Sequence, residues 1–234
     1  MASLAAPANF LAVVFDAVGT LLFADPPVTD VYHLAGWQFG SRLERDEIGR
    51  RLRAAFAACE AGEGLNRPAT SEPAERERWQ RIVATVFDDV AAPAQSRLFR
   101  ELWNHFAQPE NWRLFDDVPL TLAELARRGY RLAIASNFDR RLHAIRAAHA
   151  PLAPCERCFV SSELGFSKPD SRFFSAIEQQ LGLASNELLL VGDDETNDVR
   201  GARAAGWRML HLRRKGELSS KREIASLAEL LRLL

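Results

Sequence analysis

Residues 10–21 read FLAVVFDAVGTL and carry the pattern that decides the fold. The apolar run Phe10–Phe15 is typical of a fully buried strand. Asp16 follows this run directly, and a carboxylate is costly to bury at such a point unless it has a partner or a chemical task. Gly19 allows the backbone to turn sharply just beyond it. We therefore expect a buried strand that ends in a functional aspartate.

An alternation of strands and helices continues along the chain. Short apolar runs predict buried strands over Arg131–Ser136, Glu187–Gly192 and Trp207–Leu212. Amphipathic patterns predict helices over Leu120–Arg128, Asp139–Ala148, Pro169–Leu181 and Val199–Ala205. Strands that alternate with helices form parallel sheets with right-handed crossovers. The expected fold class is therefore α/β, with an open parallel sheet.

Residues 25–115 break this alternation and predict a separate helical domain. Helical spacing recurs over Arg42–Cys59, Glu72–Val90 and Pro93–Ala107, and no convincing strand lies in the segment. Turn residues mark its ends, with Pro26-Pro27 on one side and Asp116-Asp117 on the other. We expect a core built from residues 1–24 and 116–234, and a helical domain over residues 25–115. The stretch Glu60–Pro73, rich in glycine and proline, is expected to be a mobile loop.

Composition excludes several classes of protein. The chain has 234 residues, with 30 basic and 31 acidic side chains and a net charge of -1. A dedicated nucleic-acid binder would carry a basic excess, so no nucleic-acid partner is expected. No stretch approaches 18 uninterrupted apolar residues, so no membrane span is expected either. The oligomeric state is left open by these numbers.

The three cysteines are too few for a disulfide framework, and a cytoplasmic location is the expectation. Cys155 and Cys158 form a C-x-x-C pair without two further ligands at zinc spacing. We interpret them as neighbouring thiols in a loop, with a redox pair as the alternative.

The residues that follow the predicted strands carry the chemistry, because ligands bind beyond the carboxyl ends of the strands in open α/β sheets. Asp16 is joined there by Ser136, Asn137, Lys168, Asp193, Asp194 and Asp198. A carboxylate such as Asp16 can attack an electrophilic phosphorus or carbon atom. Several carboxylates at one point repel one another unless a hard cation such as Mg²⁺ lies between them. Lys168 stands out further, because only Lys168, Lys215 and Lys221 among the 30 basic residues are lysines.

The order and spacing of these residues resemble the haloacid dehalogenase superfamily of hydrolases, in its branch with a helical cap. The four motifs of that superfamily match Asp16-Ala17-Val18-Gly19-Thr20-Leu21, Ser136-Asn137, Lys168-Pro169-Asp170 and Gly192-Asp193-Asp194 through Asp198. The resemblance covers nearly the whole chain. It implies a Rossmann-like core with an inserted helical cap, an aspartyl covalent intermediate and a Mg²⁺ cofactor.

The resemblance also assigns roles to individual residues. Asp16 would be the nucleophile and a metal ligand, Asp193 the second ligand, and Asp198 or Asp194 would support the metal. Ser136 and Lys168 would bind the phosphoryl group. Asn137 would bind either the phosphoryl region or its own loop, with the loop slightly favoured.

Val18 departs from the pattern of the family's phosphatases. They carry a second aspartate at this position, which protonates the leaving group and then activates water. Valine has no proton to exchange, although the backbone carbonyl of Val18 remains available as a metal ligand. Losing a general acid–base typically costs about 10²–10⁴-fold in rate. Glu63 and His33, in the predicted helical domain, are candidate replacements.

The activity expected from these residues is that of a Mg²⁺-dependent phosphatase or phosphotransferase acting on a small phosphorylated metabolite. A 2-haloacid dehalogenase is one alternative, although the acidic residues Asp193, Asp194 and Asp198 argue against a metal-free site. A catalytically weak member that binds a ligand or a partner protein is another. A Schiff-base mechanism in the helical domain is excluded, because no lysine precedes Lys168.

Other polar residues have structural interpretations. Asp170 and Asp139 are expected to lie at helix starts, where the helix dipole favours acids. His143, His149 and His211 are interpreted as surface or structural histidines. The run Arg213-Arg214-Lys215 is expected to be a solvated end.

Overall fold

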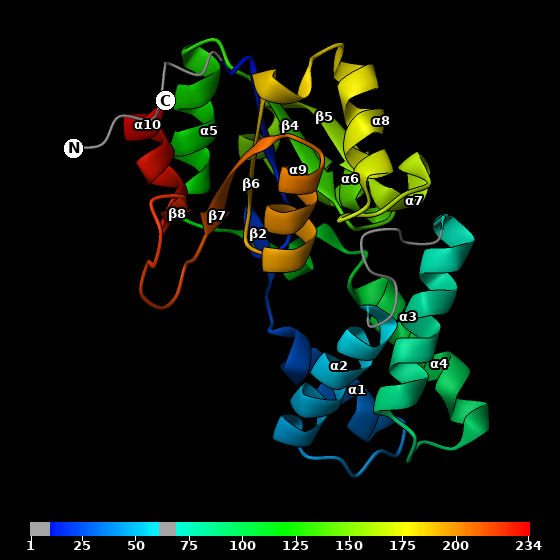
Figure 1. The fold of residues 1–234 in the computed structure, drawn as a ribbon. Coiled ribbons are helices and arrows are strands. Elements are labelled where there is room, and N and C mark those ends of the chain that lie inside the picture. Colours follow the sequence, from blue (N-terminus) through cyan, green and yellow to red (C-terminus); the bar gives the residue numbers. More distant parts are fainter. Residues whose placement is uncertain (1–9, 61–68) are drawn as a thin grey trace.

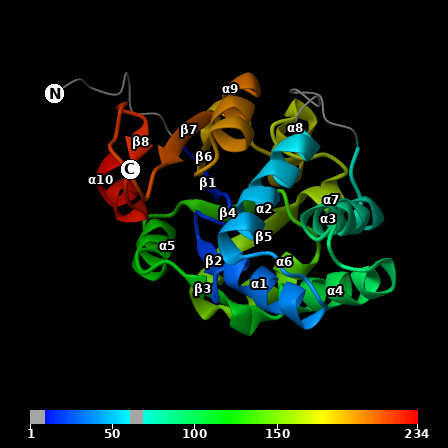
Figure 2. The same cartoon turned by 90° about the horizontal axis from the view of Figure 1, so that it is seen from below.

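The computed structural model describes residues 10–60 and 69–234. A sheet covered by helices on both faces forms one part of the molecule, and four helices form a second part beyond one end of the sheet (Figure 1). The view from below shows these four helices on the side of β4 and β5, so that β7 and β8 are left uncovered (Figure 2). Within the described residues, no helix has both the length and the apolar character that a membrane span requires.

The described residues form a six-stranded sheet in the order β5-β4-β1-β6-β7-β8, and every neighbouring pair is parallel. Its strands are β1 (Ala12–Phe15), β4 (Arg131–Ser136), β5 (Cys155–Val160), β6 (Leu188–Gly192), β7 (Arg208–Leu212) and β8 (Glu223–Ile224). β1 lies between β4 and β6, with Phe15 opposite both Ile134 and Val191. The residues that follow these three strands therefore emerge side by side. The prediction of a parallel α/β fold is confirmed.

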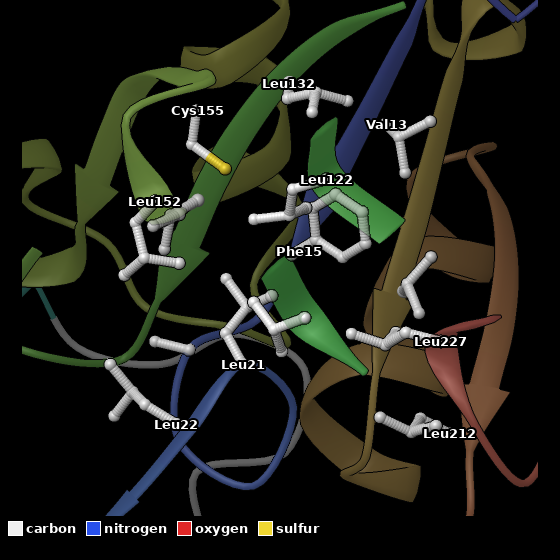
Figure 3. Close-up of a cluster of buried hydrophobic side chains, with 14 of the residues drawn as sticks. Val13, Phe15, Leu21, Leu22, Leu122, Leu132, Leu152, Cys155, Leu212 and Leu227 are labelled. Atoms are coloured by element: carbon white, nitrogen blue, oxygen red, sulfur yellow. The ribbon is translucent and has the colours of Figure 1, made fainter. Parts of the chain in front are cut away.

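Two apolar layers hold the sheet between helices. One face packs on α5 (Val118–Arg127), α6 (Arg141–Ala148) and the C-terminal α10 (Leu230–Leu233), and Figure 3 shows part of this cluster around Phe15 and Leu122. The other face packs on α8 (Ser171–Leu181) and α9 (Gly201–Ala204). Because β1 is buried on both faces, its four residues are all apolar, as its sequence pattern predicted.

Two strands of the six-stranded sheet escaped prediction, β5 and β8. β5 lies at the edge of the sheet and includes the exposed Glu156 and Arg157, which interrupt its apolar pattern. The C-x-x-C pair therefore lies in a strand, and the expectation of loop thiols was wrong. Burial raises the pKa of both Cys155 and Cys158 to about 12, so both thiols stay protonated at neutral pH. Protonated thiols are poor nucleophiles, which disfavours the redox alternative.

The observed boundaries of the core helices differ from the predicted ones by a few residues. α8 begins at Ser171, and Asp170 accepts a hydrogen bond from the Arg172 backbone N–H as its N-cap. The predicted helix over Val199–Ala205 is part of a longer segment, since a π-helical turn over Glu195–Arg200 leads into α9. A short helix, α7 (Ser161–Leu164), follows β5.

The inserted part consists of four helices with a core of their own. They are α1 (Val28–Gln38), α2 (Arg45–Glu60), α3 (Glu72–Val86) and α4 (Ala92–His105). Buried side chains such as Tyr32, Ile48, Phe87 and Leu98 pack between them. α1 escaped prediction, and α3 and α4 end earlier than their patterns suggested. Residues 61–68 of the predicted mobile loop lie outside the described residues.

The expectation that residues 25–115 contain no strand was wrong. β3 (Trp112–Leu114) pairs antiparallel with β2 (Leu22–Ala24). Strands of three residues are too short to show an alternating pattern in sequence. The pair joins the two points at which the chain passes between the sheet and the four helices.

The four helices are also attached to the core away from these crossings. At the start of α3, a Glu72 oxygen accepts hydrogen bonds from the Arg140 backbone N–H at 2.9 Å and from the Ser162 hydroxyl. The Thr70 N–H donates to the Gly165 carbonyl at 2.9 Å. Burial favours the protonated form of Glu72, but the bonds from Ser162 and Arg140 outweigh it and lower the pKa of Glu72. This contact fixes the helices beside the residues that follow β4 and β5.

We predict that Glu72→Ala lowers the free energy of unfolding by about 1–3 kcal/mol, because it leaves donors on the core side without an acceptor. Urea denaturation at neutral pH measures this change. The loss should be full above the ordinary pKa of 4.5 and shrink as the pH falls through the lower folded-state pKa. Glu77→Ala, at an exposed site on the same helix, is the control and should change stability by less than about 0.5 kcal/mol. Equal losses in both variants would contradict the contact.

Candidate active site

Asp16 lies at the carboxyl end of β1, where an ammonium group holds it. Lys168 Nζ donates to Asp16 Oδ1 at 2.6 Å, to Asp198 Oδ1 at 2.6 Å and to the Ala135 carbonyl at 2.9 Å. Asp16 and Asp198 are almost fully buried, as is Lys168. An ammonium has three N–H groups, so Lys168 gives all of them to protein oxygens.

The Asp16 and Asp198 carboxylates keep Lys168 in its charged ammonium form. Burial alone lowers the pKa of Lys168, but the Asp16 and Asp198 carboxylates outweigh burial and raise it above its usual value. The ammonium is therefore charged throughout the neutral range. In this arrangement Lys168 orients Asp16 and has no free N–H for a ligand, whereas the family resemblance also assigned it a contact with the phosphoryl group.

Three carboxylates converge beside this lysine. Asp16, Asp193 and Asp198 each offer an oxygen, and these oxygens lie within 4.8 Å of one another. Desolvation is the main reason that the pKa of each is raised, to about 6 for Asp198, although Asp193 is the most exposed of the three, and their mutual repulsion adds to it. With Lys168 charged, three ionised carboxylates leave a net charge of -2. An all-oxygen set of this charge fits a hard divalent cation such as Mg²⁺.

Two glycines make room for these carboxylates. A Cβ at Gly19 would lie 2.3 Å from Asp193 Oδ2, and a Cβ at Gly192 would lie 2.3 Å from Asp198 Oδ2. Gly19 also has a φ of 89°, which disfavours any other residue. The Thr20 hydroxyl donates to Asp193 Oδ1 at 3.0 Å and ties the loop after β1 to the loop after β6.

A pocket of about 180 Å³ opens over the buried lysine. Its lining residues are Asp16, Val18, Ser136, Asn137, Phe138, Lys168, Asp193, Asp194, Asn197 and Asp198. The site residues expected from the four motifs are among them, so the structure brings this set together. The pocket lies at the carboxyl ends of β1, β4 and β6, as the fold class predicts.

The polar residues after β4 have distinct surroundings. Asn137 exchanges two hydrogen bonds with the Lys168 backbone, since its Nδ2 donates to the carbonyl at 2.8 Å and its Oδ1 accepts from the N–H at 2.7 Å. Asn137 therefore holds the loop that carries the lysine. Ser136 lines the pocket, and its hydroxyl makes no hydrogen bond to another described residue. Binding of substrate by Ser136 and Asn137 stays a prediction.

The other candidates are placed as follows. Asp194 caps the π-helical turn by accepting from the Thr196 and Asn197 backbone N–H groups at 2.8 and 2.7 Å. Val18 lines the pocket and exposes 40% of its surface. His33 is on α1 and is not a lining residue of the pocket, and Glu63 lies outside the described residues.

Arg214 is the residue that sequence reasoning missed. Its guanidinium donates to the carbonyls of Gly19 at 3.3 Å and Thr20 at 2.7 Å, and it pairs with both oxygens of Asp117 at 3.0 Å. It also lies 3.7 Å from the centre of the Phe115 ring. The expectation of a solvated end was wrong for this residue, because its side chain is only 18% exposed. One basic residue within a short basic run gives no signal of contacts with residues so far away in sequence.

Asp117 connects Arg214 to the C-terminal segment. It accepts from the Ser226 hydroxyl at 2.7 Å and the Leu227 N–H at 2.8 Å. Burial favours the protonated form of Asp117, but Arg214 and Ser226 outweigh it and lower the pKa of Asp117. The pair therefore fixes the loop after β1 to the point where the chain returns from the four helices.

His211 also lies closer to the site than expected. Its Nε2 is 3.0 Å from the Asp193 carbonyl oxygen, while its Nδ1 is 3.6 Å from Glu195. The ring supports the backbone of the loop after β6, which agrees with a structural role.

The chain is similar to known proteins over most of its length. The model of the haloacid dehalogenase-like hydrolase family matches residues 10–206. Haloacid dehalogenase-like hydrolase domain-containing protein 3 of Homo sapiens is 30% identical over 201 residues, which cover 82% of this chain and 77% of that protein. Phosphoserine phosphatase of Thermus thermophilus is 30% identical over 198 residues, which cover 72% of this chain and 80% of that protein. The structure of L-2-haloacid dehalogenase from Xanthobacter autotrophicus is similar with a TM-score of 0.72 at 21% identity, covering 96% and 98%, and shows a shared fold.

We predict that Arg214→Ala lowers the free energy of unfolding by about 2–3 kcal/mol, because it leaves the partly buried Asp117 and two loop carbonyls without their charged donor. Urea denaturation measures the change. Arg213→Ala is the matched control. Arg213 is 36% exposed and pairs with Glu223 at 3.6 Å, so its loss should cost less than about 1 kcal/mol. If the two variants were equally stable, the role assigned to Arg214 would be wrong.

Proposed function

Because the chain belongs to the haloacid dehalogenase-like hydrolase family, we propose that it is a Mg²⁺-dependent phosphatase or phosphotransferase. Its substrate is a small phosphorylated metabolite, and the phosphoryl group passes through an aspartyl-phosphate at Asp16. The observation that carries the proposal is the contact of Lys168 with Asp16 beside two further carboxylates, those of Asp193 and Asp198. The similarity to a phosphoserine phosphatase supports phosphate chemistry.

The nucleophile is prepared by its surroundings. Asp16 must be ionised to attack phosphorus, and burial opposes ionisation by raising its pKa. Lys168 favours the ionised form and fixes one carboxylate oxygen at 2.6 Å. The Ser136 hydroxyl, which lines the same pocket, donates to an oxygen of the transferring phosphoryl group.

The residues present fit Mg²⁺. Asp16 and Asp193 would supply carboxylate oxygens, and the backbone carbonyl of Val18 would be the neutral ligand. Both oxygens of Asp198 already have protein partners, so its main effect on the cation is through charge. When bound, Mg²⁺ offsets the negative charge of the carboxylates and of the phosphoryl oxygens.

A 2-haloacid dehalogenase is the second candidate. It is favoured by Val18, since a halide ion leaves without a proton, and by the shared fold. It is disfavoured by charge, because a 2-haloacid carries a carboxylate of its own. No arginine is among the described lining residues, and Lys168 has no free N–H, so without a bound cation that carboxylate would meet a site of net charge -2, whereas the proposed phosphatase holds Mg²⁺ there. We therefore favour the phosphatase over the dehalogenase and over an inactive binding protein.

We predict that Mg²⁺ raises the melting temperature of the protein. A ligand at a hundred times its Kd adds about 2.7 kcal/mol to stability. Asp193→Asn should melt higher than the wild type without Mg²⁺, because it removes a repelling charge, and should gain little from Mg²⁺. Asp194→Asn is the control, since Asp194 lies outside the cluster and asparagine also caps a helix. A Mg²⁺ response that persists in Asp193→Asn would place the cation elsewhere.

We predict turnover of phosphate compounds that requires both Mg²⁺ and Asp16. The measurement is a panel of phosphate compounds and 2-haloacids, assayed with and without Mg²⁺. Asp16→Asn should lower the rate at least about 10⁴-fold, because the amide cannot act as the nucleophile. Release of halide from haloacids without metal would instead support the dehalogenase. No turnover, together with no binding of beryllium fluoride as a phosphoryl mimic, would support the binding protein.

A further inference from the structure

The pocket over Asp16 has no free group that could give a proton to a leaving group. Of its described lining residues, none is a histidine, glutamate, tyrosine or cysteine. The only acids are four aspartates, and Asp16 is one of them. Amide and hydroxyl groups such as those of Asn137 and Ser136 do not release protons near neutral pH. Lys168 gives all three of its N–H groups to protein oxygens, so any proton donor among the described lining residues must be one of the other three aspartates.

Each of these aspartates is already engaged. Asp198 is 1% exposed, with one oxygen on Lys168 and the other accepting from the Asp194 N–H at 3.1 Å. Asp193 accepts from Thr20 and belongs to the carboxylate cluster that fits the cation. Asp194 accepts two backbone N–H bonds as the cap of the π-helical turn. All three therefore already serve as hydrogen-bond acceptors or belong to the carboxylate cluster.

Apolar side chains occupy the place of such a donor. Val18 stands two residues after Asp16 and lines the pocket with 40% of its surface exposed. Phe138 is the other apolar lining residue. A leaving group beside Val18 meets a surface that neither donates nor accepts a proton.

From this we propose that the substrate is an activated phosphate, an acyl phosphate or a phosphoanhydride, whose leaving group departs without protonation. The inference rests on the proposed phosphatase function and narrows its substrate class. An ordinary alkyl phosphate ester would release a strongly basic alkoxide, which needs a proton from the protein as the bond breaks. A carboxylate or a phosphate is a weak base and leaves as the free anion.

The transfer is balanced without a protein acid. An oxygen of Asp16 forms a bond to phosphorus while the bond from phosphorus to the leaving oxygen breaks, and the electron pair leaves with that oxygen. Water then attacks phosphorus, the bond to Asp16 breaks, Asp16 recovers its carboxylate, and the proton from water passes to solvent. Since none of the described lining residues is a free base for the second step, the aspartyl-phosphate accumulates during turnover.

The test compares acetyl phosphate with a small alkyl phosphate in the presence of Mg²⁺, for the wild type, Val18→Asp and Val18→Asn. Val18 is exposed enough for either polar side chain to be solvated, and thermal melting checks that both variants fold. Val18→Asp should raise kcat/KM for the alkyl phosphate by about 10²–10⁴-fold, because it supplies a general acid. It should change kcat/KM for acetyl phosphate by less than about tenfold. Val18→Asn has the shape of aspartate without its proton chemistry and should show neither gain.

A second readout follows the covalent intermediate. Rapid mixing of wild-type protein with acetyl phosphate should give a burst of acetate approaching one equivalent per active site. The same reaction should leave acid-stable phosphate on the protein, and the phosphate should be absent from Asp16→Asn. Val18→Asp should shorten the lifetime of this phosphoprotein, because the new carboxylate can activate water.

The outcomes separate the two proposals. Comparable kcat/KM for both substrates in the wild type, or an equal gain for both in Val18→Asp, would overturn the substrate class and leave the phosphatase function standing. No turnover of either substrate and no binding of beryllium fluoride would overturn the phosphatase function itself. The proposal would be supported if the wild type has a much higher kcat/KM for acetyl phosphate than for the alkyl phosphate. Val18→Asp should then reduce this ratio, and Val18→Asn should leave it unchanged.

Discussion

The contact of the Lys168 ammonium with Asp16 and Asp198 is the interaction on which the rest of the site depends. A buried ammonium is stable only when its hydrogen bonds are complete, and removal of one partner from such a group typically costs about 3–5 kcal/mol. Completing them requires the ends of β1, β4 and β6 to lie side by side, because Asp16, the Ala135 carbonyl and Asp198 come from these three strands or the turns after them. The order of the central strands is therefore a condition for the site as well as for the core. Asn137 adds to it by fixing the backbone of Lys168.

The same contact leaves the site short of positive charge. One ammonium faces three carboxylates, and burial raises the pKa of all three acids. Gly19 and Gly192 bring these acids close together, since any side chain at either position would meet a carboxylate. Such an arrangement is unfavourable for the folded chain alone. It is explained by the binding of a divalent cation, which we propose as the cofactor. The cation would attract the three carboxylates and offset their mutual repulsion.

Around the site, the loops are fixed more firmly than their sequences indicate. Arg214 ties the loop after β1 to Asp117, at the point where the chain returns from the four helices. Glu72 ties the start of α3 to the residues after β4 and β5. Each acid among the described lining residues already has a hydrogen-bond partner, and the fixed loops keep these partners in place. The absence of a free proton donor among the described lining residues is thus a property of the whole hydrogen-bond network as well as of Val18.

The sequence by itself determined the features that depend on neighbours along the chain. The apolar runs of β1, β4, β6 and β7 mark buried strands, the helical spacings mark most of the helices, and the polar residues after the strands name the site. The parallel α/β core with its helical insert followed from these patterns, and the family resemblance implied that the core is Rossmann-like. Only the tertiary structure decided which charges meet, because Lys168 and Asp16 are 152 positions apart, and Arg214 and Gly19 are 195 apart. It also decided β5, β8 and the β2-β3 pair, whose residues are too few or too polar to form a pattern and are held in strands by their neighbours. Local periodicity depends only on residues that are neighbours in sequence, whereas hydrogen bonds between distant residues form only when the chain folds.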